Sequence, residues 1–315
     1  MKEAPTFFIG APRSGTSILF EAFHAHEELA CFTQWTTRLA PRLPLAGRVQ
    51  RLAARLPGYQ AGAKARRGRN RFPANLRPRP VEAWDLWNAL TGVDIARSTD
   101  PERHLTADAA ERTREALAEF VAATGRRQFA HKFTGPPRIR LLRTLFPHAR
   151  FVHIRRDPAA TVRSLLAVEF WRDEGGLQAP WWDGLLNEED LEFLRCNDTP
   201  ELLALLQCRR IVERTAEEAA ELPAGRFREI TFEEFLRAPQ QTIEDLWAFC
   251  ELPPTNDPQR LQRTIAQLDR SAAGGTAPEP AREPEPALRE ATALLQTYLA
   301  RQGGFAADAQ GGLAC

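Results

Sequence analysis

Short apolar runs of strand length alternate with amphipathic stretches of helical length along most of the chain. We read four strands, at 6–9 (TFFI), 127–132 (RQFAHK), 150–155 (RFVHIR) and 226–231 (RFREIT). A helical pattern follows each of them, at 16–26, 138–146, 158–170 and 239–251. Proline stands near the first turn of the last three helices, where its missing N–H costs nothing. Strands and helices in this alternation predict an α/β fold of three layers, with a central parallel sheet flanked by helices.

Two longer stretches interrupt the alternation, and we interpret both as helical insertions that form a binding surface or a lid. The first, 27–126, has helical patterns at 43–57 and 107–123, and its segment 38–79 holds twelve basic residues and no acidic one. That segment is either a solvated helical face with a loop or an electropositive lid that attracts an anion. The second insertion, 171–200, carries three tryptophans, which either line a pocket or, as we favour, pack inside a small helical flap.

The C-terminal part differs in composition from the rest. Residues 271–286 are rich in proline and glycine and read as a linker, and an amphipathic helix follows at about 287–301 within a C-terminal segment 287–315. We therefore expect a single α/β domain over 1–270, then the linker, then a helix and tail. A chain of 315 residues is long enough for one large domain with insertions.

Composition narrows the class of protein. The 42 basic and 41 acidic side chains nearly cancel, which gives no reason to expect a nucleic-acid partner. No apolar run approaches the roughly 20 residues of a membrane span, and the N-terminus lacks the apolar core of a signal peptide, so we expect no transmembrane segment and a cytoplasmic location. The five cysteines are scattered without C-x-x-C spacing, which argues against a disulfide framework and a zinc site.

The loop after the first strand has the pattern of a phosphate-binding loop. Residues 10–17 read GAPRSGTS, and Gly10, Gly15 and Ser17 fit the nucleotide template G-x-x-x-x-G-K-[ST], whereas Thr16 stands where the template has lysine. The backbone N–H groups from Ser14 to Ser17 and the start of the following helix should converge on an anion. Arg13 adds a planar guanidinium that suits phosphate or sulfate oxygens. This pattern predicts a P-loop-like fold without the lysine that serves a γ-phosphate.

A second anion motif is expected at the end of the third strand. In FVHIRRDPAATVRSLL, residues 151–166, arginine stands where a magnesium-binding strand would end in a carboxylate. Asp157 is placed to cap the next helix, with Pro158 in its first turn. Arg156 at the strand end and Ser164, two turns into the helix, could bind one phosphate together. The alternative is that Arg156 pairs with a surface carboxylate and Ser164 is an ordinary helix residue.

Together, PRSGTS at 12–17 and RDP at 156–158 with Ser164 resemble the sulfotransferases that use 3′-phosphoadenosine-5′-phosphosulfate (PAPS), and ITFEEFLRAPQQTIEDLWAFCELP at 230–253 extends the resemblance. The bacterial and tyrosylprotein-type branch is the most similar. The resemblance implies that Arg13, Ser14, Gly15, Thr16 and Ser17 bind the 5′-phosphosulfate, and that Arg156 and Ser164 bind the 3′-phosphate. It implies PAPS as donor, adenosine 3′,5′-bisphosphate (PAP) as product, no metal, and in-line transfer to a small-molecule, lipid or glycan acceptor.

Two alternatives to a sulfotransferase remain: a P-loop nucleotide kinase or NTPase, and an inactive nucleotide-binding relative. The sequence does not indicate the oligomeric state.

The resemblance also proposes catalytic residues. Only three of the 42 basic residues are lysines, and Lys132 stands at the end of a predicted strand, where the family places a lysine near the sulfonate. The family's base positions hold Gln34 and Thr134 here, neither of which takes a proton at neutral pH. We expect His131 to face away from Lys132, and His24 and His26 to cap or pack. Glu82, in RPRPVEAWDLWNAL, is therefore our candidate for the base; the alternative is a solvated carboxylate at a helix start.

Overall fold

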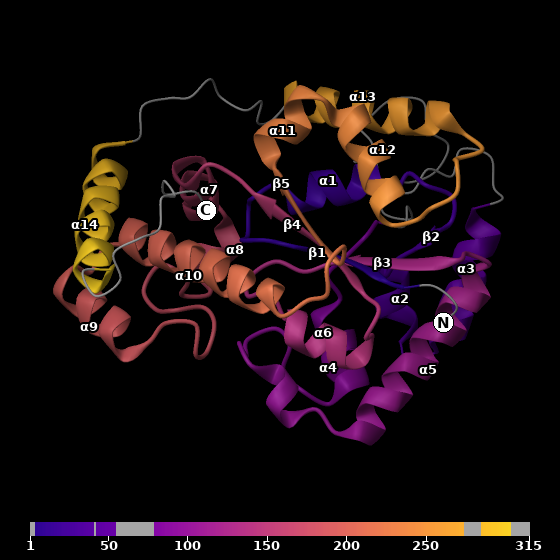
Figure 1. Ribbon diagram of the computed structural model, residues 1–315, viewed down its shortest axis with the longest axis horizontal. Coiled ribbons are helices and arrows are strands. Elements are labelled where there is room, and N and C mark those ends of the chain that lie inside the picture. The colour runs from indigo at the N-terminus through magenta and orange to yellow at the C-terminus, as the bar shows by residue number, and fades with distance from the viewer. Residues whose placement is uncertain (1–3, 41, 55–78, 274–284, 304–315) are drawn as a thin grey trace.

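The computed structural model describes residues 4–40, 42–54, 79–273 and 285–303, and its centre is a sheet of five parallel strands (Figure 1). The strand order is β2-β3-β1-β4-β5, and every pairing is parallel. The strands are β1 (Thr6–Ile9), β2 (Leu29–Ala30), β3 (Gln128–Lys132), β4 (Arg150–Arg155) and β5 (Phe227–Thr231). The predicted α/β fold with a central parallel sheet is confirmed.

The sequence of the central strand β1 is a nearly continuous apolar run. All four of its residues are buried, because helices cover both faces of the sheet. Phe7 packs among the rings of one face, including Phe129, Phe146 and Phe151, while Phe8 packs on the other face against Phe20. Successive side chains of one strand thus belong to two separate hydrophobic clusters.

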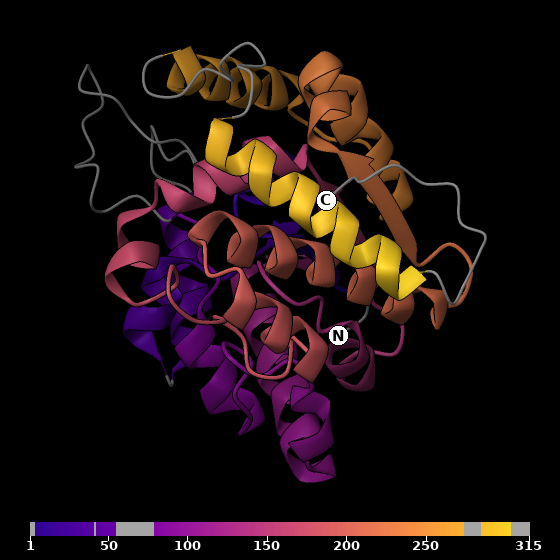
Figure 2. The same cartoon turned by 90° about the vertical axis from the view of Figure 1, so that its left-hand side faces the viewer.

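Helices surround the sheet in three groups (Figures 1 and 2). The group on one face consists of α1 (Thr16–Phe23), α11 (Phe232–Arg237), α12 (Pro239–Phe249) and α13 (Pro258–Ala273). The group on the opposite face consists of α2 (Gln34–Leu39), α3 (Leu43–Ala53), α4 (Trp84–Thr91), the 3-10 helix η2 (Pro101–His104), α5 (Ala107–Thr124) and α6 (Ile139–Leu145). The third group forms a separate cluster and consists of α7 (Pro158–Leu166), α8 (Glu169–Asp173), α9 (Glu188–Cys196), α10 (Pro200–Ala220) and α14 (Pro286–Gly303).

Local start signals account for several helix boundaries. Asp157 caps α7 by accepting a hydrogen bond from Ala160 N at 2.7 Å, as predicted, and Pro158 is the first residue of that helix. Thr199 and Thr231 cap α10 and α11 in the same way. Each of these side chains pairs a backbone N–H that has no acceptor within its own helix.

The structure differs from the sequence analysis at three places. Strand β2 was not predicted, since two residues show no periodicity, and it lies inside the stretch read as an insertion. The helix predicted over 158–170 is two helices, because the chain turns after α7 and so buries Trp171 against Trp181 and Trp182. The predicted linker is too long at both ends: 271–273 are the last turn of α13, and α14 begins at Pro286. Residues 274–284 lie outside the described residues, as does most of the basic segment, 55–78.

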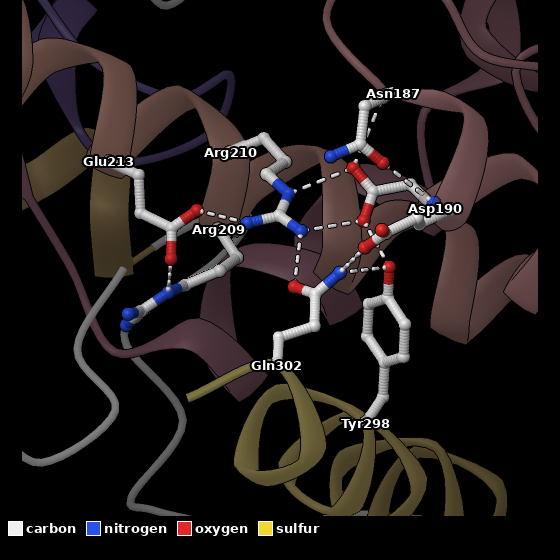
Figure 3. A network of polar contacts seen from close by, with 8 residues as sticks. Asn187, Asp190, Arg209, Arg210, Glu213, Tyr298 and Gln302 are labelled. Atoms are coloured by element: carbon white, nitrogen blue, oxygen red, sulfur yellow. Dashed lines mark hydrogen bonds and ion pairs between the residues drawn. The ribbon is translucent and has the colours of Figure 1, made fainter. Parts of the chain in front are cut away.

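The C-terminal helix α14 is held against α9 and α10 by a buried carboxylate (Figure 3). Asp190 is fully buried and accepts two hydrogen bonds from Arg210, at 2.6 and 2.9 Å, and one from the Tyr298 hydroxyl at 2.8 Å. The Tyr298 ring stacks on Phe193 with centroids 4.0 Å apart. Gln302, one turn further on, accepts from Arg210 at 3.0 Å. Helix α14 therefore packs against the helices that carry the third hydrophobic cluster.

Candidate active site

The predicted phosphate loop joins β1 to α1 and is shaped by two left-handed residues. Arg13 has φ 71° and Gly15, the N-cap of α1, has φ 97°. A Cβ on Gly15 would overlap the ring of Phe232, so only glycine fits this position. The buried Ser14 and Thr16 hydroxyls lie 2.9 Å apart and bond to each other within the loop.

The loop leaves fewer backbone donors for an anion than predicted. Ser14 N donates to Ala11 O at 3.2 Å, so this amide closes the turn instead of facing outward. The N–H groups of Thr16 and Ser17 belong to the first turn of α1, where no helical acceptor exists. These two amides and that of Gly15, together with the exposed side chains of Arg13 and Ser17, are the groups that the loop offers to an anion.

The second anion motif lies directly against the first loop. Arg13 Nε donates to Ser164 Oγ at 3.0 Å, and Arg156 Nη1 donates to the backbone oxygen of Arg13 at 3.1 Å. Pairing of β1 with β4 brings the two strand ends together, although the residues are more than 140 positions apart in the chain. Arg13, which was expected to bind the 5′-phosphosulfate, thus also bonds to Ser164, which was expected to bind the 3′-phosphate.

Arg156 is partly buried and keeps its charge. Burial lowers its pKa, and the charge of Glu233 partly offsets this effect, while its guanidinium lies 5.0 Å from the centre of the Phe232 ring. Within the described residues, no carboxylate lies within ion-pair distance of Arg156. This geometry disfavours the reading of Arg156 as one half of a surface ion pair.

The three residues Lys132, Glu82 and Thr134 form a compact cluster, and we call it the Lys132–Glu82 cluster. Lys132 Nζ lies 2.9 Å from Glu82 Oε1, and Thr134 Oγ1 lies 3.1 and 3.2 Å from the two oxygens of Glu82. The side chains of Lys132 and Glu82 are 11% and 19% exposed, so both are largely buried.

The Lys132–Glu82 cluster and the phosphate loop share one edge of the sheet. Lys132 is paired with Phe8 across β3 and β1, and just beyond the strands Gly135 N donates to Gly10 O at 3.0 Å. The chain after β3 therefore runs beside the start of the phosphate loop. Since the carboxyl ends of parallel strands meet at this edge, the fold brings both predicted catalytic residues to the edge that carries the predicted anion site.

The backbone around Glu82 is fixed by its own conformation and by contacts to two residues that are distant in the chain, His131 and Phe32. Ala83, the next residue, has φ 53° and is the N-cap of α4, a conformation that non-glycine residues adopt only rarely. His131 Nε2 lies 2.9 Å both from the backbone oxygen of Glu82, to which it donates if it carries the ring proton, and from Trp87 Nε1, from which it accepts if it does not. Val81 N donates to Phe32 O at 3.1 Å. These contacts fix the backbone from which the Glu82 side chain reaches Lys132.

The histidines lie outside the Lys132–Glu82 cluster. His131 is buried on the opposite side of β3 from Lys132, as predicted, and burial lowers its pKa to about 3, so the ring is neutral. His24 is the C-cap of α1, and burial likewise lowers its pKa to about 3. His26 is buried, with Nε2 2.9 Å from Pro253 O. Gln34 starts α2, and its Oε1 accepts from Arg79 N at 2.5 Å, which is a structural contact.

Sequence reasoning missed two residues that complete the candidate site. Thr134 was considered only as the wrong residue for a base, yet its hydroxyl bonds to Glu82. Phe232 was not considered, although its ring lies under both Gly15 and Arg156. Their positions next to strand ends could have indicated them. Thr134 stands two residues beyond Lys132, and Phe232 directly follows β5 at the same edge of the sheet.

Two features are absent from the described ranges. No helix there is long and apolar enough to span a bilayer. In the same part of the chain, no group of three or more His, Cys, Asp and Glu side chains is arranged to hold a metal ion.

Comparison with known proteins identifies the family. The family model described as "Sulfotransferase family" matches residues 5–257, which is most of the chain. The chain therefore belongs to the sulfotransferase family. No curated protein sequence matches the chain.

Solved structures of sulfotransferases are among those similar to this chain. Sulfotransferase STF9 from Mycobacterium avium is 18% identical with a TM-score of 0.53, and the match covers 99% of this chain and 79% of that one. A sulfotransferase domain from the curacin biosynthetic pathway is 14% identical with a TM-score of 0.48, covering 93% and 98%. Sulfotransferase STF1 from Mycobacterium tuberculosis is 13% identical with a TM-score of 0.47, covering 87% and 76%. At such identities, the similarity to STF9 establishes the fold alone.

Proposed function

We propose that this sulfotransferase uses PAPS as its donor and transfers the sulfuryl group to a hydroxyl or amine of a small-molecule, lipid or glycan acceptor. The observation that carries the proposal is the contact between two anion motifs that are far apart in the chain. Arg13 of the loop after β1 is bonded to Ser164 of the helix after β4, and Arg156 is bonded to the backbone of Arg13. A donor with two separate anionic ends suits such a pair of motifs better than a single phosphate does.

The groups at this edge fit PAPS chemically. Arg13 and Arg156 offer two guanidiniums, Ser17 and Ser164 offer hydroxyls, and the first turn of α1 offers two amides, all suited to phosphate or sulfate oxygens. Thr16 stands where nucleotide kinases have a lysine, which disfavours ATP as the donor. When bound, PAPS supplies the sulfuryl group and a nucleotide leaving group.

We assign proton uptake from the acceptor and stabilisation of the leaving group to the Lys132–Glu82 cluster. We assign Glu82, which is bonded to Lys132 at this edge, the role of accepting the proton that the acceptor loses. The ammonium of Lys132 has three N–H donors, so it can keep one on Glu82 and direct another at the developing charge of the leaving group. The one hydroxyl proton of Thr134 is shared between the two oxygens of Glu82, which maintains the orientation of the carboxylate if Lys132 turns away. We assign Thr134 as a positioning residue.

Incubation of the purified protein with PAPS and a panel of phenols, amines, sterols and sugars tests this proposal. Chromatography would measure release of PAP in each mixture. We expect PAP release that depends on the presence of one class of acceptor and falls when Glu82→Gln replaces the wild type. Binding of PAP without turnover across the whole panel would instead favour the inactive nucleotide-binding relative.

A further inference from the structure

Helix α3 carries an exposed apolar stripe. Four large apolar side chains of the described residues are exposed, and two of them, Leu45 at 41% and Leu52 at 60%, lie on α3. They are seven positions apart, which is two turns of a helix, so they share one face. Val49, four positions after Leu45, lies between them and is only partly buried. A single exposed leucine is ordinary, whereas three aligned apolar side chains form a patch.

The other face of α3 already has its partner within the fold. The buried residues of this helix are Leu43, Ala46, Gly47, Gln50 and Ala53. Gly47 packs so closely on α5 that an added Cβ would lie 2.8 Å from the Cβ of Ala123. Helix α3 lies beside α5 at the outside of the molecule (Figure 1). The exposed stripe is therefore not the face that attaches α3 to the protein.

Every charged side chain of α2, α3 and the residues between them is positive. They are Arg38, Arg42, Arg48 and Arg51, all exposed, and residues 34–54 contain no Asp or Glu. Among the described residues, no carboxylate forms an ion pair with any of these four arginines. The neighbouring helix α5 has two exposed carboxylates without an ion pair in the same part of the chain, Glu115 and Glu119. The four arginines outnumber them, so this surface favours an anionic partner.

Trp35 adds a residue type that suits the boundary between water and lipid. It lies on α2, which packs against α3, and its side chain is only partly buried. Indole and arginine side chains each have an apolar body and a polar end, so both can lie along a bilayer surface with the polar end among the headgroups. An acidic protein segment would match the arginines but would give the leucines no apolar partner. A bilayer with anionic lipids matches both.

We propose that α2 and α3 form a docking surface for a membrane that contains anionic lipids. Leu45, Val49 and Leu52 enter the boundary between headgroups and acyl chains, and the four arginines bind the anionic headgroups. Helix α3 lies in the plane of the bilayer, because its 11 residues are too few to cross it. The surface contains no residue of either anion motif or of the Lys132–Glu82 cluster, so the proposal stands independently of the identity of the sulfuryl donor.

Co-sedimentation of the full chain with lipid vesicles tests the proposal. The probes are vesicles of phosphatidylcholine alone and of phosphatidylcholine with about one third phosphatidylserine. We expect the partition coefficient onto the anionic vesicles to be higher by about tenfold or more. Poly-glutamate, which offers carboxylates without an apolar layer, serves as the soluble anionic control.

Two changes on α3 test the charge and the apolar stripe separately. Arg48→Glu should weaken binding to the anionic vesicles by about tenfold or more. The double variant Leu45→Gln, Leu52→Gln removes apolar surface without adding charge and should weaken it by a similar factor. The matched controls Arg228→Glu and Leu236→Gln make the same kinds of change on exposed residues of β5 and α11, and binding should stay within about twofold of the wild type.

Binding that requires phosphatidylserine and is lost in both α3 variants supports the proposal. No binding to the anionic vesicles, equal binding to the two kinds of vesicle, or binding retained in either α3 variant would overturn it. Binding retained in the leucine variant, with poly-glutamate bound as tightly as the vesicles, would indicate an acidic protein partner instead. If circular dichroism shows that Arg48→Glu is unfolded, Arg42→Glu, also on an exposed side chain, replaces it with the same expected loss.

Discussion

At the scale of single residues, the account depends on one carboxylate with two different partners. Glu82 accepts from a charged donor, Lys132, and from a neutral one, Thr134, at nearly equal distances of 2.9 to 3.2 Å. The ion pair is partly buried, so breaking it in the ground state would leave a charge without its partner. Thr134 keeps the carboxylate in place without carrying charge, and this is the reason for reading it as a positioning residue.

Glu82→Gln should lower kcat by about 10²- to 10⁴-fold, the usual contribution of a general base, because an amide does not take up the acceptor's proton. The affinity for PAP should change little, since Glu82 does not belong to either anion motif. Steady-state kinetics together with PAP calorimetry measure both quantities. Asp85→Asn is the matched control, because Asp85 is an exposed carboxylate in the first turn of α4. A kcat within about threefold of wild type would remove Glu82 as the base.

Lys132→Ala should lower kcat more than it weakens PAP binding, because the ammonium is most needed as charge develops on the leaving group. The variant also leaves Glu82 without its ion pair, so the double variant Lys132→Ala, Glu82→Gln separates the two effects. If Lys132 and Glu82 act in the same step, the double variant should be barely slower than the single ones. A loss confined to binding would make Lys132 a clamp for the donor.

At the scale of elements, the four predicted strands agree with the structure because short segments with buried apolar residues alternate with helical patterns. The sheet then aligns the strand ends, which is why the phosphate loop, Arg156 and Lys132 could be placed at one edge from the sequence. Asp157 and Pro158 likewise marked the start of α7 correctly.

The position of Glu82 could not be predicted in the same way. The segment before α4 has no periodicity, and its path depends on contacts with residues far apart in the chain, Phe32 and His131. For the same reason, the sequence did not indicate that Arg13 would bond to Ser164. Both contacts arise only when distant elements pack together, and local patterns contain no information about them.

The attachment of α14 gives a prediction at this scale. Tyr298→Phe keeps the ring stacked on Phe193 but removes the hydroxyl that donates to buried Asp190. Hydrogen bonds to charged groups are worth about 1.5 to 3 kcal/mol, so we expect the free energy of unfolding in urea to fall by about 1.5 kcal/mol. Thr297→Ala, on the neighbouring exposed residue, is the control and should change it by less than about 0.5 kcal/mol. Equal stabilities for the two variants would mean that the Tyr298 hydroxyl does not hold α14.

At the scale of the whole molecule, two buried histidines should make the protein sensitive to acid. Burial lowers the pKa of His24 and of His131 from 6.5 to about 3, so the folded state holds both rings neutral while the unfolded state protonates them below 6.5. Between pH 6.5 and 3 the unfolded state binds more protons, and stability is therefore lost as the pH falls. Above pH 6.5 these groups should contribute no pH dependence.

His24→Gln tests this behaviour without touching the candidate site. The free energy of unfolding, measured in urea from pH 5 to 8, should fall below pH 6.5 with a smaller slope in the variant than in the wild type. The difference should approach one proton, or about 1.4 kcal/mol per pH unit. Parallel curves for the two proteins would show that His24 is not held neutral in the fold.

The central claim is that two anion motifs at one edge of the sheet bind the two ends of one nucleotide. Calorimetric titration with PAP, beside 5′-AMP and ATP·Mg²⁺, tests it most directly. We predict that PAP binds at least tenfold more tightly than AMP, and that Arg156→Ala removes most of this preference, because a charge-assisted contact of about 1.5 to 3 kcal/mol is lost. Tighter binding of ATP·Mg²⁺, or no preference for the 3′-phosphate in the wild type, would contradict the account.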